Sequence, residues 1–180
     1  MFIREAEKAD LTDLLAVEEK AFGQFEGPEV LKLVAGLLND PTARPLLSLV
    51  ALRGKKITGH ILFTSARISS DSEMSIQLLA PLAVIPEEQN RGTGGQLIEK
   101  GLQILAQKGV KLVFVLGHPN YYPRFGFKEA GKLGFEAPYP IPEEASAAWM
   151  VRELSQGLVG KLTGKVLCAD AINRPEYWRE

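Results

Sequence analysis

An apolar run, a glycine-rich turn, an amphipathic stretch and a second apolar run follow one another between residues 75 and 117. The first run, SIQLLAPLAVI, is nearly all apolar from Leu78 onward, as expected for a strand buried on both faces of a sheet. Apolar residues then recur at helical spacing from Leu97 to Leu105, and Gly109 ends this predicted helix. The second run is VKLVFVLG. This order of elements predicts a crossover unit with two parallel strands.

Pro81 interrupts the first of these two strands. Proline has no N–H to donate to a neighbouring strand, so within sheets it is confined to edges, bulges and the ends of pairing. We therefore expect Pro81 to mark either a bulge or the point where pairing stops.

Residues 1–68 predict a short strand, then two helices, then two more strands. Residues 1–5 are typical of a short strand, and Asp10 begins a predicted helix that extends to Phe22. The segment GQFEGP is expected to end this helix, and Pro28 to begin a second one. Residues 46–68 predict two strands joined at the turn RGKK.

The length and composition are those of one globular domain. The chain has 180 residues, of which 46% are hydrophobic and 24% are charged. AWMVREL predicts one more strand late in the chain, and no interdomain linker is visible. We predict a single domain of the α/β class over residues 1–180, with residues 131–180 as an atypical C-terminal extension.

The charge and the residue composition disfavour several classes of protein. A net charge of −1 provides no excess of positive charge that would attract nucleic acid or a membrane surface. Cys168 is the only cysteine, and the two histidines, His60 and His118, form no metal signature. The start has no signal-peptide pattern, and no apolar run is long enough to span a bilayer. We expect a cytoplasmic protein without a metal, a nucleic-acid partner or a membrane partner.

Gly92, Gly94 and Gly95 stand where the first apolar run gives way to the helix. A helix N-terminus has unpaired N–H groups, and glycines there let an anion approach the main chain closely. The alternative is a tight turn with no ligand. Two other phosphate motifs fail, because Leu97 replaces the last glycine of a dinucleotide fingerprint and Val166 replaces the Ser/Thr of a P-loop in GKLTGKV.

Two motifs in this region carry a resemblance to a known family. Gln89 to Gly94 form the pattern Q-x-x-G-x-G, and Tyr122 to Phe127 form Y-x-x-x-G-F. In this order they resemble the GNAT superfamily of acyl-CoA-dependent N-acetyltransferases, and the resemblance extends over residues 1 to 130. It implies a mixed, mostly antiparallel sheet flanked by helices, in which the parallel fourth and fifth strands splay apart.

The resemblance also implies a donor, acetyl-CoA, and the residues that bind it. The turn would hold the pyrophosphate, and the end of the fourth strand would pair with the pantetheine arm. The predicted cofactor-binding residues are Leu82, Ala83, Val84, Gln89, Asn90, Arg91, Gly92, Thr93, Gly94 and Gly95. Tyr122 matches the family's general acid, whereas Tyr121 and Phe125 are expected to be packing residues.

The acceptor and the general base stay open at this level. The predicted fourth strand has no carboxylate, Glu26 is a candidate of low weight, and His118 is a possible site residue beside a structural His60. We expect transfer to a primary amine of a small molecule or a protein by direct transfer in a ternary complex. The alternative is a degenerate acyl-CoA-binding or regulatory module. A homodimer is possible, because the C-terminal tail can complete the sheet, cover the acceptor site or reach a second subunit.

Overall fold

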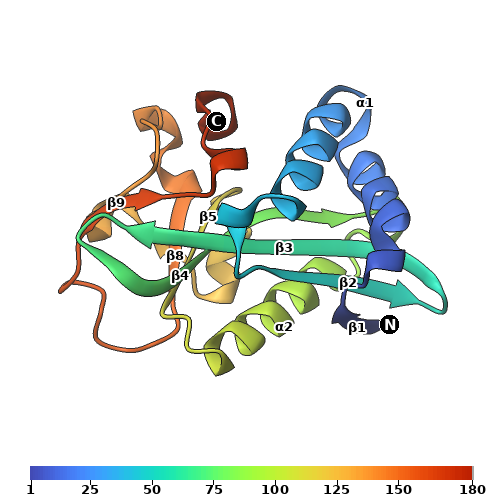
Figure 1. Ribbon diagram of the computed structural model, residues 1–180, viewed down its shortest axis with the longest axis horizontal. Coiled ribbons are helices and arrows are strands. Elements are labelled where there is room, and N and C mark those ends of the chain that lie inside the picture. The colour runs from blue at the N-terminus through green and yellow to red at the C-terminus, as the bar shows by residue number, and fades with distance from the viewer. Residues whose placement is uncertain (180) are drawn as a thin grey trace.

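The computed structural model describes residues 1–179, which form one large mixed sheet between layers of helix (Figure 1). Its main strand order is β1-β2-β3-β4-β5-β8-β6, and β9 pairs with both β3 and β7. The two α-helices are α1 (Leu11–Leu38) and α2 (Thr93–Gln107). The strands are β1 (Phe2–Glu5), β2 (Leu47–Arg53), β3 (Lys56–Ile68), β4 (Asp71–Val84), β5 (Leu112–Leu116), β6 (Lys128–Glu129), β7 (Phe135–Glu136), β8 (Trp149–Glu153) and β9 (Gly164–Leu167). Short 3-10 helices cover Lys8–Asp10, Pro41–Ala43, Pro86–Glu88, Tyr122–Phe125, Gly131–Leu133, Glu143–Ala148, Asp170–Ile172 and Pro175–Trp178.

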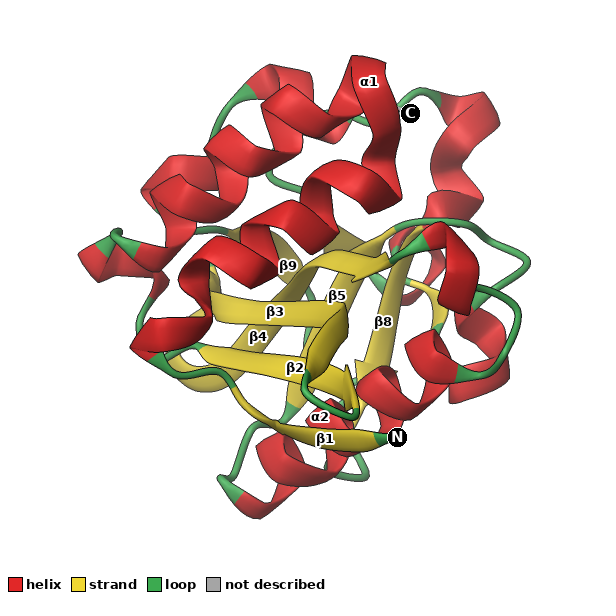
Figure 2. Ribbon diagram, turned by 90° about the vertical axis from the view of Figure 1, so that its right-hand side faces the viewer, coloured by secondary structure: helices red, strands yellow, loops and turns green. Residues whose placement is uncertain are grey.

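The predicted crossover unit is confirmed. β4 and β5 are parallel neighbours, paired from Ile76–Leu112 to Leu79–Val115, and α2 connects them. All other neighbouring pairs along the main strand order are antiparallel. α2 lies on one face of the sheet, and α1 and the C-terminal segments lie on the other (Figures 1 and 2). Neither helix is both long enough and apolar enough to span a membrane, within residues 1–179.

The N-terminal helical region differs from the prediction in extent. The two predicted helices are joined in α1, which is kinked at Gly23, where φ is 78° and ψ is −172°. The break is therefore one residue wide, and Pro28 lies inside the second half of α1 rather than at the start of a separate helix. Glycine suits the kink because its φ lies in the left-handed region.

Pro81 marks both a bulge and the end of a pairing. Against β3, the register moves from Phe63–Leu79 to Ile61–Leu82, so β4 has one extra residue beside Pro81. On the opposite edge, pairing with β5 ends at Leu79–Val115, while β4 continues to Val84. β4 therefore extends beyond its parallel neighbour, as the resemblance implies for splayed strands.

The C-terminal extension completes the sheet, which is one of the three alternatives left open by the sequence. β8 pairs with β5 along its whole length, and β9 pairs with the far end of β3. Trp149 and Trp178 are both buried, with ring centroids 5.6 Å apart, and their indole N–H groups donate to backbone carbonyls of Phe135 and Ile172. This packing ties the end of the chain to the core of the domain.

The packing of α2 on β3 yields a prediction about stability. A Cβ atom at Gly101 would collide with the buried ring of Phe63. Ala is the better helix former by about 1 kcal/mol, but overpacking costs about 1–3 kcal/mol. We expect Gly101→Ala to lower the free energy of unfolding, measured by urea denaturation. The control is Gly36→Ala in α1, whose Cβ would meet only Ala171 at 3.4 Å; it should be neutral or stabilising. Equal effects at the two sites would contradict the account.

Candidate active site

The last residues of β4 present backbone groups on an open edge. The N–H of Ile85 donates to the carbonyl of Thr58 at 3.0 Å, and His60 is the partner of Ala83 in the same register. Antiparallel pairs alternate between hydrogen-bonded and non-bonded, so Ala83 bonds to β3 while Leu82 and Val84 point their N–H and C=O groups away from it. β5 does not reach this part of β4. The backbone of Leu82 and the N–H of Val84 therefore form an edge to which an extended molecule can pair, while the Val84 carbonyl accepts from the side-chain amide of Gln89.

The N-terminus of α2 lies beside this edge. The first intrahelical bond runs from the N–H of Gln96 to the carbonyl of Gly92, so the N–H groups of Thr93, Gly94 and Gly95 have no partner among residues 1–179. The Thr93 hydroxyl is also buried without a partner among these residues. A helix start with unpaired N–H groups carries positive partial charge and suits an anion.

The turn between β4 and α2 is held by its own residues. The side-chain amide of Gln89 donates to the carbonyl of Val84 at 2.9 Å, which fixes the turn to the end of the strand. Asn90 and Gly92 have φ values of 61° and 86°, in the left-handed region that Asn tolerates and Gly adopts without strain. The turn thus brings the strand edge and the helix start to one place.

These groups line a single open pocket of about 650 Å³. Eight of the ten predicted cofactor-binding residues line it. The exceptions are Ala83, which is buried against α1, and Arg91, whose guanidinium lies 3.8 Å from Glu88. The full lining is Leu82, Val84, Glu88, Gln89, Asn90, Gly92, Thr93, Gly94, Gly95, His118, Tyr121, Arg124 and Phe125.

Aromatic rings explain two of the three glycines in part. A Cβ at Gly94 would lie 2.7 Å from the phenol oxygen of Tyr121, and a Cβ at Gly95 would lie 3.0 Å from the ring of Phe125. Both glycines therefore allow the 3-10 helix Tyr122–Phe125 and its preceding residue to pack on α2. Tyr121 and Phe125 also line the pocket, so the expectation that they only pack is too narrow.

Tyr122, the predicted general acid, lies outside the pocket lining and is only 7% exposed. Its ring packs against Phe127 and against Gly117, the residue that directly follows β5. Gly117 lies just beyond the point where the pairing of β5 with β4 ends. Burial raises the pKa of the Tyr122 phenol, so it stays protonated throughout the neutral range.

The charges around the pocket are partly paired. Glu88 is buried and accepts bonds from Arg53 at 3.0 Å, so its negative charge is compensated at the pocket wall. Arg124 stacks over the Tyr121 ring, 5.3 Å from its centroid, and has no carboxylate within 4.0 Å among residues 1–179. Arg124 is thus a cation available to an anionic ligand. It lies inside the Y-x-x-x-G-F motif, but nothing in the motif singles it out.

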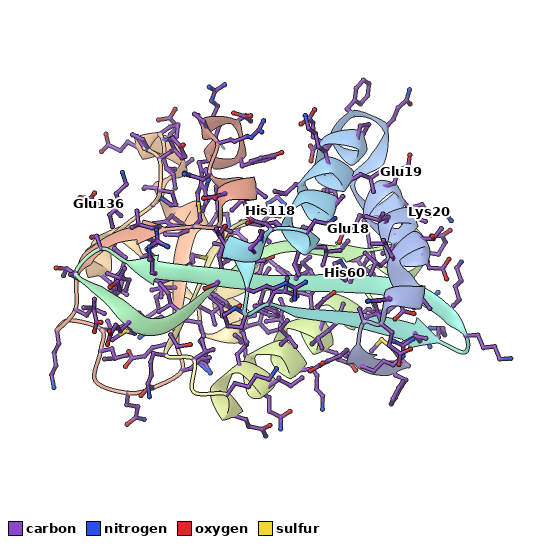
Figure 3. The ribbon with its side chains drawn as sticks, in the orientation of Figure 1. Glu18, Glu19, Lys20, His60, His118 and Glu136 are labelled. Carbon is purple, nitrogen blue, oxygen red and sulfur yellow. The ribbon has the colours of Figure 1, made fainter. Side chains whose placement is uncertain are left out.

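The two histidines differ in their surroundings. His118 is exposed and lines the pocket at the end of β5, whereas His60 is fully buried with both ring nitrogens hydrogen-bonded (Figure 3). Glu26 is exposed on α1 and is not part of the pocket lining. Within the described part of the chain, no three His, Cys, Asp or Glu side chains are grouped to hold a metal ion.

Comparisons with known proteins agree with this geometry. The uncharacterized N-acetyltransferase YjhQ of Escherichia coli is 48% identical over 166 residues, which cover 91% of this chain and 90% of YjhQ. The crystal structure of the E. coli GNAT family N-acetyltransferase YhbS in complex with CoA has a TM-score of 0.86, with 27% identity over 97% of this chain and 92% of that one. A GNAT family acetyltransferase from Brucella melitensis in complex with acetyl-CoA has a TM-score of 0.75, with 26% identity over 95% of this chain and 97% of that one.

The family comparison covers most of the same region. The model of the family described as "Acetyltransferase (GNAT) domain" matches residues 2–130, from β1 to the end of β6. Together with the identity to YjhQ over most of both chains, this match shows that the chain belongs to the GNAT family of acetyltransferases.

Proposed function

We propose that this protein transfers an acetyl group from acetyl-CoA to a primary amine by direct transfer in a ternary complex. The observation that carries the proposal is the meeting of two unpaired backbone surfaces in one pocket. The N–H groups at the start of α2 suit a pyrophosphate, and the open edge of β4 suits the amide groups of a pantetheine arm.

The residues present fit this donor. Thr93, Gly94 and Gly95 would donate N–H groups to the pyrophosphate, and Arg124 would add a positive charge. The backbone of Leu82 and the N–H of Val84 would pair with the pantetheine amides. The CoA and acetyl-CoA complexes of YhbS and the B. melitensis acetyltransferase support the same class of donor for this chain.

Acetyl-CoA supplies an activated acetyl group as a thioester, and the protein has to stabilise its attack by an amine. The N–H of Leu82 or Val84 would donate to the carbonyl oxygen as negative charge develops there. The amine nitrogen forms the new C–N bond, and the C–S bond breaks. Tyr122 would give its proton to the departing thiolate, because the buried phenol carries that proton at neutral pH.

The proton of the acceptor ammonium needs a base, and His118 is our candidate. β4 carries no carboxylate beyond Pro81, so the strand itself supplies no base. His118 follows the end of β5 and lines the same pocket as Leu82 of β4. Its exposed imidazole is open to an acceptor that comes from solvent.

The acceptor is a small-molecule amine or a protein amine, and both fit an open pocket. The competing function is acyl-CoA binding without transfer, which the position of Tyr122 outside the pocket lining favours. Release of free thiol from acetyl-CoA in the presence of amines separates the two. An enzyme releases thiol at a rate that depends on the amine, whereas a binding module does not.

Donor binding is tested with a pair of variants at the aromatic contact. Tyr121→Phe removes the phenol oxygen, after which the nearest neighbours of a Cβ at Gly94 lie at 3.6 and 3.8 Å. Gly94→Ala in the Tyr121→Phe background should therefore fold normally, yet place a methyl group against the bound pyrophosphate. By calorimetry we expect CoA affinity about tenfold or more below that of Tyr121→Phe alone, a cost of about 1.4 kcal/mol. Equal affinity would show that the glycine serves only the aromatic packing.

The role of Tyr122 is tested by comparison with its neighbour. Tyr122→Phe should lower kcat by about 10²-fold, because the thiolate loses its proton donor, while CoA affinity stays the same. Tyr121→Phe is the matched control, since it removes a phenol oxygen that touches α2 instead, and its kcat should stay near that of the wild type. Thiol release under saturating donor measures both. Full kcat in Tyr122→Phe would remove this residue as the acid.

His118 is tested through the dependence of turnover on pH. His118→Gln should lower kcat by about 10²-fold at neutral pH, because it removes the base that takes the ammonium proton. Turnover should recover as the pH rises toward the pKa of the acceptor amine, since more amine then arrives deprotonated. The control is Glu26→Gln, which removes the other candidate base, an exposed side chain outside the pocket lining, and should leave the pH profile as in the wild type. A pH profile identical to that of the wild type would rule out His118.

A further inference from the structure

A buried hydrogen-bonded chain links three elements of the fold. Nδ1 of His60 on β3 lies 2.5 Å from Oε1 of Glu18 on α1, and Nε2 lies 2.8 Å from the hydroxyl of Ser48 on β2. The side chains of Glu18 and His60 are 0% exposed. Figure 3 shows Glu18 projecting from α1 toward His60 on the sheet. Glu18, Ser48 and His60 all lie outside the lining of the donor pocket.

The geometry of the pair is fixed by its hydrogen bonds. Burial raises the pKa of Glu18, because the charged carboxylate loses its hydration. A protonated Glu18 carboxyl group would donate to Nδ1 of His60. Oε2 of Glu18 is buried without a partner among residues 1–179, so its bond to His60 is the one that fixes the carboxyl group. Both ring nitrogens of His60 are thereby used.

The position of His60 connects the chain to the donor site. The backbone of His60 pairs with Ala83, and Ala83 stands between Leu82 and Val84, whose backbone groups face the open edge. Beyond Leu79, β4 has no strand on its β5 side. The end of β4 is therefore held on one edge by β3, on one face by α1, and on the other face by the packing of Leu82 against α2.

Two of these supports, α1 and β3, are joined by the buried hydrogen bond between Glu18 and His60. Ala83 and Ile85 pack in the same apolar cluster as Leu14 and Val17 of α1. Glu18 follows Val17 directly and binds His60, so α1 and β3 are locked together beside the segment 82–84. A shift of α1 relative to β3 would move this segment.

We propose that Glu18 and His60 are positioning residues that set the direction of the Leu82 and Val84 N–H groups toward the donor. The inference rests on the proposed acetyl transfer, and it assigns a role in the reaction to residues that touch neither substrate. Small errors in the placement of an oxyanion donor cost large factors in rate, so the effect should appear in kcat.

The test uses two substitutions of Glu18 and one control. Glu18→Leu keeps the apolar bulk and removes the bond to His60, whereas Glu18→Gln can donate its amide N–H to Nδ1 as a protonated carboxyl group would. Ile68→Ala is the control, because it truncates a fully buried side chain at the far end of β3. Thiol release gives kcat and the acetyl-CoA KM. Amide hydrogen exchange by NMR reports, without any need for turnover, on Ala83 and Ile85, whose N–H groups bond to β3 on either side of Val84.

We expect Glu18→Leu to lower kcat by about 10- to 100-fold and to speed exchange at the Ala83 and Ile85 amides, whose bonds to β3 hold this segment. Glu18→Gln should recover most of both, and Ile68→Ala should change neither beyond its loss of stability. The proposal is overturned if Glu18→Leu leaves exchange at these two amides as in the wild type, or if Glu18→Gln fails to rescue. Absence of turnover in the wild-type protein would instead refute the proposed function, while the exchange data would still decide whether Glu18 positions the strand.

Discussion

The separation of β4 from β5 after Leu79 is the constraint on which the rest of the site depends. A fully paired parallel sheet would satisfy the backbone groups of Leu82 and Val84 within the protein and leave nothing for a ligand. Instead, pairing with β5 stops at Leu79, whereas β4 continues past the bulge beside Pro81 to Val84. The backbone of Leu82 and the N–H of Val84 are then open to a partner from outside, and the start of α2 beside them suits an anionic group of that partner.

The glycines at the start of α2 illustrate how one residue type can serve two demands. Gly92 has a left-handed φ of 86° and belongs to the turn itself. Gly94 and Gly95 make room for Tyr121 and Phe125, and the same absence of side chains leaves the N–H groups at the helix start accessible. Packing of the aromatic residues and access for an anion are therefore two consequences of one local sequence.

The order of elements and the place of the candidate donor pocket are predictable from sequence because they depend on short-range patterns. The apolar runs around the glycine turn fix the crossover unit, and Pro81 marks the end of pairing. The break predicted around Gly23 is confirmed only as a kink, since tertiary packing lets the two halves of α1 continue as one element.

Other features depend on long-range pairing and are invisible in a single sequence. The backbone of Ala83 bonds to β3, whereas the N–H groups of Leu82 and Val84 point to the open edge. This alternation follows from the register with β3, which no local pattern encodes. Glu18 and His60 stand 42 residues apart, and only the packing of α1 on the sheet brings them together. The adjacent residues Tyr121 and Tyr122 are indistinguishable by type, yet one lines the pocket and the other is buried behind it.

A crystal structure of the protein with CoA tests the central claim most directly. It should show the pyrophosphate on the N–H groups of Thr93 to Gly95 and the pantetheine arm paired with Leu82 and Val84 along the open edge of β4. CoA bound at any other surface, or bound here with β4 closed onto β5, would contradict the assignment of this pocket as the donor site.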